Sequence, residues 1–201
     1  MTLYQVKPAF QALLRPLMFW LYRQRIVANH VTLAALALSA IAGAMLFFFP
    51  RPGLFMLLPI VLFIRMALNA LDGMLARECG QQSRAGAILN EAGDVISDIA
   101  LYLPFIMLPE SSAALVLVML FCAMMTEFCG VLAQTVGGTR SYAGPLGKSD
   151  RALLFGAWAL GLALWPPLCG WNNIVWGAAT ALLIWTAINR CRSALRPEAV
   201  K

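Results

Sequence analysis

Polar residues recur at helical spacing in two stretches of an otherwise apolar chain. The first stretch contains Arg65, Asn69 and Asp72, which are four and then three residues apart and would share one face of a helix. The second stretch also places its polar residues within one arc of a helix: Asn90, Glu91, Asp94 and Asp98. Oxygen atoms of Asp and Asn are ligands that suit Mg2+ or Mn2+. The pattern therefore predicts a divalent-metal site between two adjacent helices.

The surroundings of these residues indicate an integral membrane protein. Of the 201 residues, 61% are hydrophobic and only 12% are charged. Apolar runs near the length that crosses about 30 Å of hydrocarbon predict six transmembrane helices. Their expected bounds are 31–49, 54–71, 86–108, 112–133, 153–166 and 173–188. All should be α-helices because hydrocarbon offers no partner to an unpaired backbone group, so we expect an all-α fold with a single membrane domain over residues 1–201.

The basic residues predict the orientation of these helices. With an even number of spans, both termini and the loops at 72–85 and 134–152 lie on one side, together with every lysine and arginine except Arg51 and Arg65. The positive-inside rule makes that side cytoplasmic. We therefore expect a multi-pass protein of a bacterial-type inner membrane with both termini in the cytoplasm. The net charge of +6 suits anionic lipid headgroups and calls for no nucleic acid.

Residues 1–28 are expected to form an amphipathic helix on the membrane surface, because apolar and polar side chains would occupy different faces. The apolar face would consist of Phe10, Leu13, Leu14, Leu17 and Leu21. Pro8 and Pro16 are expected to kink or divide this helix.

Charges inside the hydrocarbon require partners, since inserting a charged side chain at the centre of a membrane costs about 2.5 to 3.5 kcal/mol. Arg65 and Asp98 would lie at similar depths on antiparallel helices. An ion pair between them is therefore the alternative to metal ligation by Asp98. Glu127, isolated in the fourth span, has the same structural alternative.

A longer pattern passes through both polar stretches. It consists of Asp72-Gly73, Ala76-Arg77, a spacer of eight residues, Gly86, and then Asn90 and Asp94 at four-residue spacing. This pattern resembles the signature of the CDP-alcohol phosphotransferases, D-x-x-D-G-x-x-A-R-x8-G-x3-D-x3-D. The resemblance implies six membrane helices with a surface helix at the amino end. It also implies transfer of a phosphatidyl group from a CDP-linked lipid to an acceptor alcohol, release of CMP, and two divalent metals between the carboxylates and the diphosphate.

The resemblance assigns roles to single residues. Asp94 takes the position of the general base. The metal-binding positions are Asn69, Asp72, Asn90 and Asp94. Among the residues on the donor side, Gly73 would let a phosphate or a helix approach closely, Arg77 would pair with the diphosphate, and Gly86 completes the signature.

Two other stretches resemble parts of the family pattern. Asn29 and Thr32 match an N-x-x-T stretch near the nucleotide, and the alternative is an ordinary helix cap by Asn29. Before the fifth span, Lys148 and Arg151 lie where the family often has basic residues near its acceptor or phosphate site. Topological positive charge explains these two residues equally well.

The chain departs from the signature at two of its four aspartates, where it has Asn69 and Asn90. An amide keeps an oxygen that can bind a metal, but it brings no charge. We therefore expect two metals to bind more weakly, or one of them to be absent. Glu91 and Asp98 are extra acids that could restore negative charge to the site.

These observations and the resemblance favour metal-dependent transfer of a phosphatidyl group from CDP-diacylglycerol, or a related CDP-alcohol, to an acceptor alcohol in phospholipid biosynthesis. One alternative is a related membrane protein that binds a nucleotide lipid but has lost turnover through Asn69 and Asn90. A small transporter that uses the intramembrane charges is the third hypothesis. The identity of the acceptor stays open, and so does a homodimer, since Gly93 and Ser97 form a small-x3-small pair that could pack helices within or between protomers.

Overall fold

The computed structural model describes residues 7–195, and residues 1–6 and 196–201 lie outside the described part. The described chain is helical and contains no strand, which confirms the all-α expectation. Its α-helices are α1 (Lys7–Arg23), α2 (Ala28–Phe48), α3 (Leu57–Glu78), α4 (Arg84–Tyr102), α5 (Ala113–Thr135), α6 (Lys148–Leu164) and α7 (Asn172–Ala194). Short 3-10 helices precede α3, follow α4 and precede α7: η2 (Pro52–Met56), η3 (Leu103–Met107) and η4 (Pro166–Trp171).

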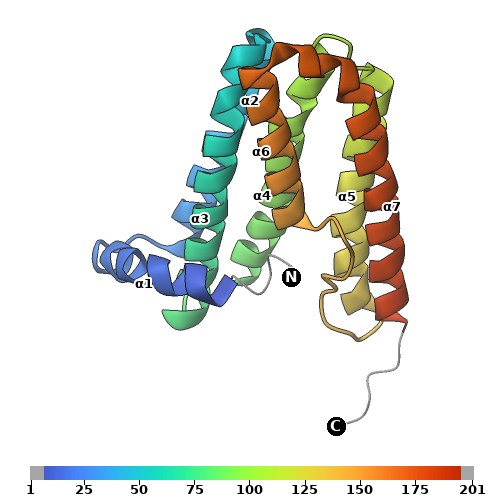
Figure 1. Ribbon diagram of the computed structural model, residues 1–201. Helices are drawn as coiled ribbons and strands as arrows, with labels where there is room; N and C mark the ends of the chain where they lie inside the picture. The colour runs from blue at the N-terminus through green and yellow to red at the C-terminus, as the bar shows by residue number, and fades with distance from the viewer. Residues whose placement is uncertain (1–6, 196–201) are drawn as a thin grey trace.

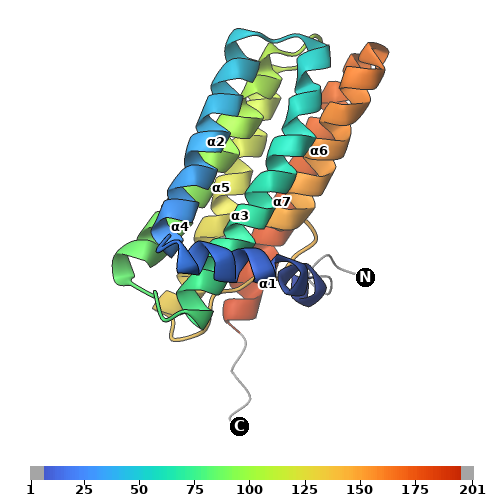
Figure 2. The same cartoon turned by 90° about the vertical axis from the view of Figure 1, so that its left-hand side faces the viewer.

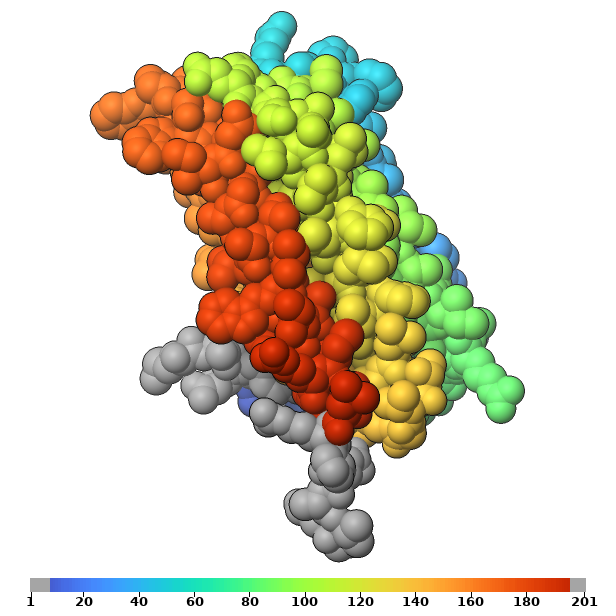
Figure 3. Space-filling model, turned by 90° about the vertical axis from the view of Figure 1, so that its right-hand side faces the viewer, coloured from blue at the N-terminus to red at the C-terminus, as the bar shows by residue number. Residues whose placement is uncertain are grey.

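Helices α2 to α7 run alongside one another as a bundle, and α1 lies across one end of it (Figures 1 and 2). The same end carries the α3–α4 connection, the α5–α6 loop and the C-terminal end of α7 (Figure 1). Helix α2 packs against both α3 and α4, and α5 packs along α7. Figure 3 shows α5 and α7 against each other over the length of one face. The loops that the sequence assigns to one side thus lie at one end of the bundle.

Four helical segments are long and apolar enough to cross a membrane: Ala28–Phe48, Pro52–Glu78, Ala113–Thr135 and Pro166–Ala194. They correspond to the first, second, fourth and sixth expected spans. The other two long helices differ, because α6 has only 17 residues and α4 contains Arg84, Glu91, Asp94 and Asp98. Length and composition therefore support four spans, while α4 and α6 bring polar side chains into the bundle.

Helix α1 is continuous although it contains Pro16. Its buried side is centred on Met18, which belongs to an apolar cluster shared with α2 and α3. The expected apolar face is divided by this packing, because Leu14 and Leu21 pack against the cluster whereas Leu13 and Leu17 remain exposed. The packed side therefore faces the bundle, and the placement of this helix on a membrane surface stays a prediction.

Two apolar clusters fill the bundle. The larger contains aromatic rings that lie against one another: Phe55, Tyr102, Phe105, Phe155 and Trp176. The smaller cluster lies beside α1. Along α3, Leu62 belongs to the larger cluster and Leu71 to the smaller, with Arg65 buried between them. A polar layer therefore separates the two clusters.

Small residues bring α2 and α4 together. A Cβ atom at Gly43 would lie 2.1 Å from the main-chain oxygen of Ala100, so a larger residue would force the helices apart. Gly93 on α4 faces α2, because a Cβ atom there would lie 3.8 Å from Cγ2 of Thr32. Ser97 is buried as well. In the described structure Gly93 and Ser97 are thus used for packing within the protomer.

Candidate active site

The four residues at the expected metal-binding positions meet across α3 and α4, where they form two crossed hydrogen bonds. Nδ2 of Asn69 on α3 donates to Oδ1 of Asp94 on α4 over 3.1 Å. Nδ2 of Asn90 on α4 donates to Oδ2 of Asp72 on α3 over 3.2 Å. Helical spacing alone brings these residues to one face of each helix, as expected. Each asparagine therefore faces an aspartate on the opposite helix.

Asp72 is the more buried of the two aspartates. Its side chain also accepts a hydrogen bond from Oγ1 of Thr32, 2.9 Å away on α2. Both hydrogen bonds reach Oδ2, and both donors, Thr32 and Asn90, are neutral. Thr32 thus belongs to this cluster through Asp72.

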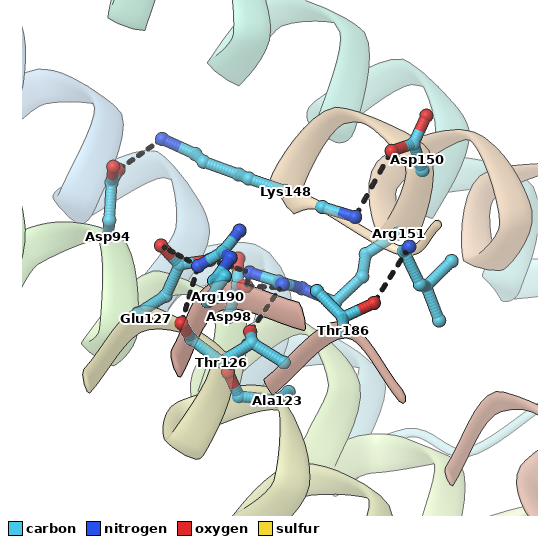
Figure 4. Close-up of polar contacts among 12 residues, drawn as sticks. Asp94, Asp98, Ala123, Thr126, Glu127, Lys148, Asp150, Arg151, Thr186 and Arg190 are labelled. Atoms are coloured by element: carbon cyan, nitrogen blue, oxygen red, sulfur yellow. Dashed lines mark hydrogen bonds and ion pairs between the residues drawn. The ribbon is translucent and has the colours of Figure 1, made fainter. Parts of the chain in front are cut away.

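Asp94 is partly open, since 14% of its side chain is exposed, and it has charged neighbours. The ammonium group of Lys148 contacts its Oδ1 from the start of α6 (Figure 4). Nη2 of Arg65 lies 3.6 Å from the same oxygen and donates to the main-chain oxygen of Asp94 over 2.9 Å. The proposed base therefore has a carboxylate that is held from three sides and is still accessible.

Lys148 and Arg151 lie in a helix and not in the loop that the sequence predicts before the fifth span. Helix α6 begins at Lys148 because Asp150 caps it, accepting a hydrogen bond from the main-chain N–H of Gly147 over 3.1 Å. Arg151 is fully buried, and positive charge at a membrane interface would leave it exposed. Topological positive charge therefore does not account for the burial of Arg151.

Asp98 lies between two arginines in the polar layer. Its Oδ1 is 2.5 Å from Nη1 of Arg65, and its Oδ2 is 2.7 Å from Nη2 and 3.1 Å from Nε of Arg151. The structure thus contains the Arg65–Asp98 ion pair that the sequence offered as an alternative to metal ligation. With both oxygens engaged by guanidinium groups, Asp98 is a structural counterion.

Glu127 is the centre of a second group of ion pairs. Its Oε1 lies 2.8 Å from Nη2 of Arg151, and its Oε2 lies 3.3 Å from Nη1 of Arg190 (Figure 4). Oε2 also lies 2.8 Å from Nη2 of Arg140. Arg140 also contacts the carboxylate of Glu91. Burial lowers the pKa of Arg140, but the neighbouring carboxylates, Glu91 first, raise it more, so its pKa lies above the usual value. Glu91 on α4 is therefore paired with a residue of the α5–α6 loop and does not join the Asp72–Asp94 cluster.

Sequence reasoning missed the parts of Arg140 and Arg190 in this network. Arg190 is buried, and its Nη1 donates to the main-chain oxygen of Thr126 over 2.5 Å. Thr186, four residues earlier on the same face of α7, is buried too and accepts a hydrogen bond from the N–H of Leu146 over 3.0 Å. That spacing is a usable pattern for Arg190. Arg140 lies in the α5–α6 loop, where no periodicity marks it.

The remaining predicted residues lie at the α1 end of the site. A Cβ atom at Gly73 would lie 2.8 Å from Nη2 of Arg77, so the glycine leaves space for the guanidinium group one turn later. A Cβ atom at Gly86 would lie 2.7 Å from Oδ1 of Asn29. The interpretation of Asn29 as a helix cap is wrong, because α2 begins at Ala28 and its N-cap residue, Val27, makes no side-chain cap. The side chain of Gln81 accepts the hydrogen bond from the N–H of Ala28 instead, over 2.8 Å.

The donor set of the site fits one hard divalent cation better than two. Among residues 7–195, no group of three His, Cys, Asp or Glu side chains is placed to hold a metal. The cluster offers two carboxylates and two amides, and oxygen ligands of these kinds suit Mg2+ or Mn2+. The side chains of Asn69 and Asn90 donate hydrogen bonds to these carboxylates but add no negative charge of their own. A second dication would find little negative charge left.

Comparison with known proteins decides the family. The family model for CDP-alcohol phosphatidyltransferases matches residues 25–188. The chain belongs to this family. It is 70% identical over 195 residues to a protein of Escherichia coli (strain K12) called inner membrane protein YnbA, and the match covers 97% of each chain.

Solved structures of a phosphatidylinositol phosphate synthase, PgsA1 from Mycobacterium tuberculosis, share the fold of this family member. The structure with bound CDP-DAG has a TM-score of 0.75 at 22% identity and covers 92% of this chain and 96% of that one. The structure in complex with manganese and citrate has a TM-score of 0.74 at 22% identity and covers 92% and 91%. The bundle of α2 to α7 with α1 across its end is therefore a fold that this synthase also adopts.

Proposed function

We propose that this chain transfers a phosphatidyl group from CDP-diacylglycerol to an acceptor alcohol, releases CMP, and depends on Mg2+ or Mn2+. The observation that carries the proposal is the convergence of Asn69, Asp72, Asn90 and Asp94 in one cluster at the junction of α3 and α4. Family membership supports the reaction class. The complex of PgsA1 with CDP-DAG supports the choice of donor.

Asp94 is the proposed general base, because its carboxylate is partly exposed while that of Asp72 is buried. The acceptor oxygen bonds to the phosphorus that carries diacylglycerol, the bond from this phosphorus to the CMP oxygen breaks, and the acceptor proton passes to Asp94. A divalent cation, when bound, neutralises charge on the diphosphate. Asp72, with the amide oxygens of Asn69 and Asn90, would hold it.

The proposed donor contacts lie beside this cluster. Arg77 is exposed next to Gly73, and its planar guanidinium group can pair with phosphate oxygens. Asn29 and Thr32 lie at the start of α2, where Asn29 is close to Gly86 and Thr32 to Gly93, and we assign them to the cytidine side of the donor. Lys148 lies at the edge of the site, whereas Arg151 is assigned a structural part in holding α6.

We further propose that all six bundle helices cross an inner membrane, with the α1 end and both termini in the cytoplasm. The alignment of α4 and α6 with the four apolar helices supports this topology (Figure 1). The concentration of arginine and lysine in the chain segments at the α1 end of the bundle supports it as well. The diphosphate of a membrane-anchored donor would then lie at the level of the Asp72–Asp94 cluster.

A second candidate is a protein that binds the nucleotide lipid without turnover. It is favoured by the crossed hydrogen bonds, because an asparagine side chain on the opposite helix already pairs with each aspartate. The two candidates differ in one product, since only a transferase releases CMP.

The test uses purified full-length protein with CDP-diacylglycerol labelled in the cytidine and a panel of acceptor alcohols. A transferase releases labelled CMP in the presence of Mg2+ or Mn2+, stops in EDTA, and forms a lipid whose mass identifies the acceptor. Asp94→Asn should abolish release, whereas Glu78→Gln, in an exposed ion pair with Arg15, should retain it. Binding of the donor without release of CMP, whichever acceptor is added, would favour the binding protein.

A further inference from the structure

Two ion pairs connect α4 to α6. On α4, Asp94 and Asp98 are four residues apart, and on α6, Lys148 and Arg151 are three residues apart, so each pair shares a helix face. Lys148 contacts Asp94, and Arg151 contacts Asp98 at 2.7 Å (Figure 4). Because Arg151 is fully buried and fixed by Asp98 and Glu127, the start of α6 has a fixed register against α4. Lys148 is therefore directed to Asp94 by the fold.

We propose that this site binds one divalent cation, at Asp72, and that the ammonium group of Lys148 takes the place of a second cation at Asp94. The inference rests on the proposed function, in which the positive charge serves a donor diphosphate. It concerns the number and place of the cations, which the reaction class leaves open.

The charges around the two aspartates differ. Asp94 contacts the ammonium group of Lys148 and has Arg65 3.6 Å away, so a divalent ion there would lie beside two positive groups. Asp72 receives its hydrogen bonds from a hydroxyl and an amide, Thr32 and Asn90, which repel no cation. Like charges at such short range oppose one another strongly in a partly buried site. The divalent ion is thus directed to Asp72.

The two asparagines make this arrangement possible. Asn69 donates to Asp94 over 3.1 Å, and an aspartate in its place would set a second carboxylate at that distance. Two carboxylates so close require a further cation or a proton. With Asn69 present, the single charge of Lys148 suffices for Asp94. The asparagine at position 69, where the family signature has an aspartate, and the contact of Lys148 with Asp94 therefore act together.

The experiment counts manganese ions bound by purified full-length protein in detergent, without donor, by equilibrium dialysis and by the electron paramagnetic resonance signal of free Mn2+. Wild type should bind one ion per chain, and Asp72→Asn should bind none. Lys148→Met should bind two, because Asp94 loses its ammonium partner. Arg192→Met removes the same charge from an exposed position on the last turn of α7 and should bind one.

Asn69→Asp provides an independent test and should also bind two ions. Retained helicity by circular dichroism and a single gel-filtration peak select the variants that are compared. Two ions or none on wild type would overturn the inference, and so would a single ion on both Lys148→Met and Asn69→Asp. One ion on wild type without CMP release from CDP-diacylglycerol would reject the proposed transfer reaction and leave the cation assignment standing.

Discussion

Replacing Asp98 with asparagine tests whether this residue is a structural counterion. The amide has nearly the same shape as the carboxylate but removes the one negative charge that Arg65 and Arg151 share at 2.5 and 2.7 Å. Removing one partner of a buried ion pair costs about 3 to 5 kcal/mol. Arg151 keeps Glu127 and Thr126, and Arg65 keeps the main-chain oxygen of Asp94, so we expect the lower end, about 3 kcal/mol.

The free energy of unfolding is measured in mixed micelles by titration with sodium dodecyl sulfate, followed by far-ultraviolet circular dichroism. Glu78→Gln is the matched control, because its ion pair with Arg15 leaves 36% and 53% of the two side chains exposed. Exposed pairs contribute about 0 to 1 kcal/mol, so this variant should stay within that range. If Asp98→Asn is no less stable than Glu78→Gln, or if it retains stability but loses bound manganese, Asp98 is not the counterion that the ion pairs indicate.

Two further predictions concern packing and orientation. Gly43→Ala should destabilise the protein by about 1 to 3 kcal/mol through overpacking against Ala100, whereas Gly177→Ala on α7, where a Cβ atom meets nothing within 4 Å, should be neutral or stabilise by up to about 1 kcal/mol in the same titration. Equal effects of the two substitutions would contradict the close approach of α2 and α4. Cys191, exposed near the end of α7, should react with a membrane-impermeant maleimide in inverted membrane vesicles and not in intact spheroplasts when it is the sole cysteine. The reverse pattern would invert the proposed orientation.

The part of the site that the sequence predicts is the part that follows from helical periodicity. Residues three or four apart on one helix share a face whatever the rest of the fold does, so Asn69 lies on one face with Asp72, and Asn90 on one face with Asp94. These two faces meet through the hydrogen bonds from Asn69 to Asp94 and from Asn90 to Asp72. The same geometry anticipates the depth match of Arg65 and Asp98. The α3–α4 half of the site can therefore be predicted from the helical spacing of polar residues within apolar segments.

The α6 half depends on contacts between distant segments, which periodicity does not reveal. In the sequence, Lys148 and Arg151 look like ordinary basic residues of a membrane interface. Only the register of α6 against α4 shows that they form ion pairs with Asp94 and Asp98. The start of α2 is a similar case. Its first free N–H, that of Ala28, is satisfied by Gln81 from the α3–α4 connection, so Asn29 is not needed as a cap. In both cases a contact with a residue far away in the sequence takes the place of the local interaction that the sequence suggests.

The proposed cation site can be located by diffraction from crystals of the protein with CDP-diacylglycerol and manganese, recorded at a wavelength where manganese scatters anomalously. We expect one anomalous peak beside Asp72, next to the donor diphosphate, with the ammonium group of Lys148 still on Asp94. Absence of any peak beside Asp72 while the donor is bound would contradict it.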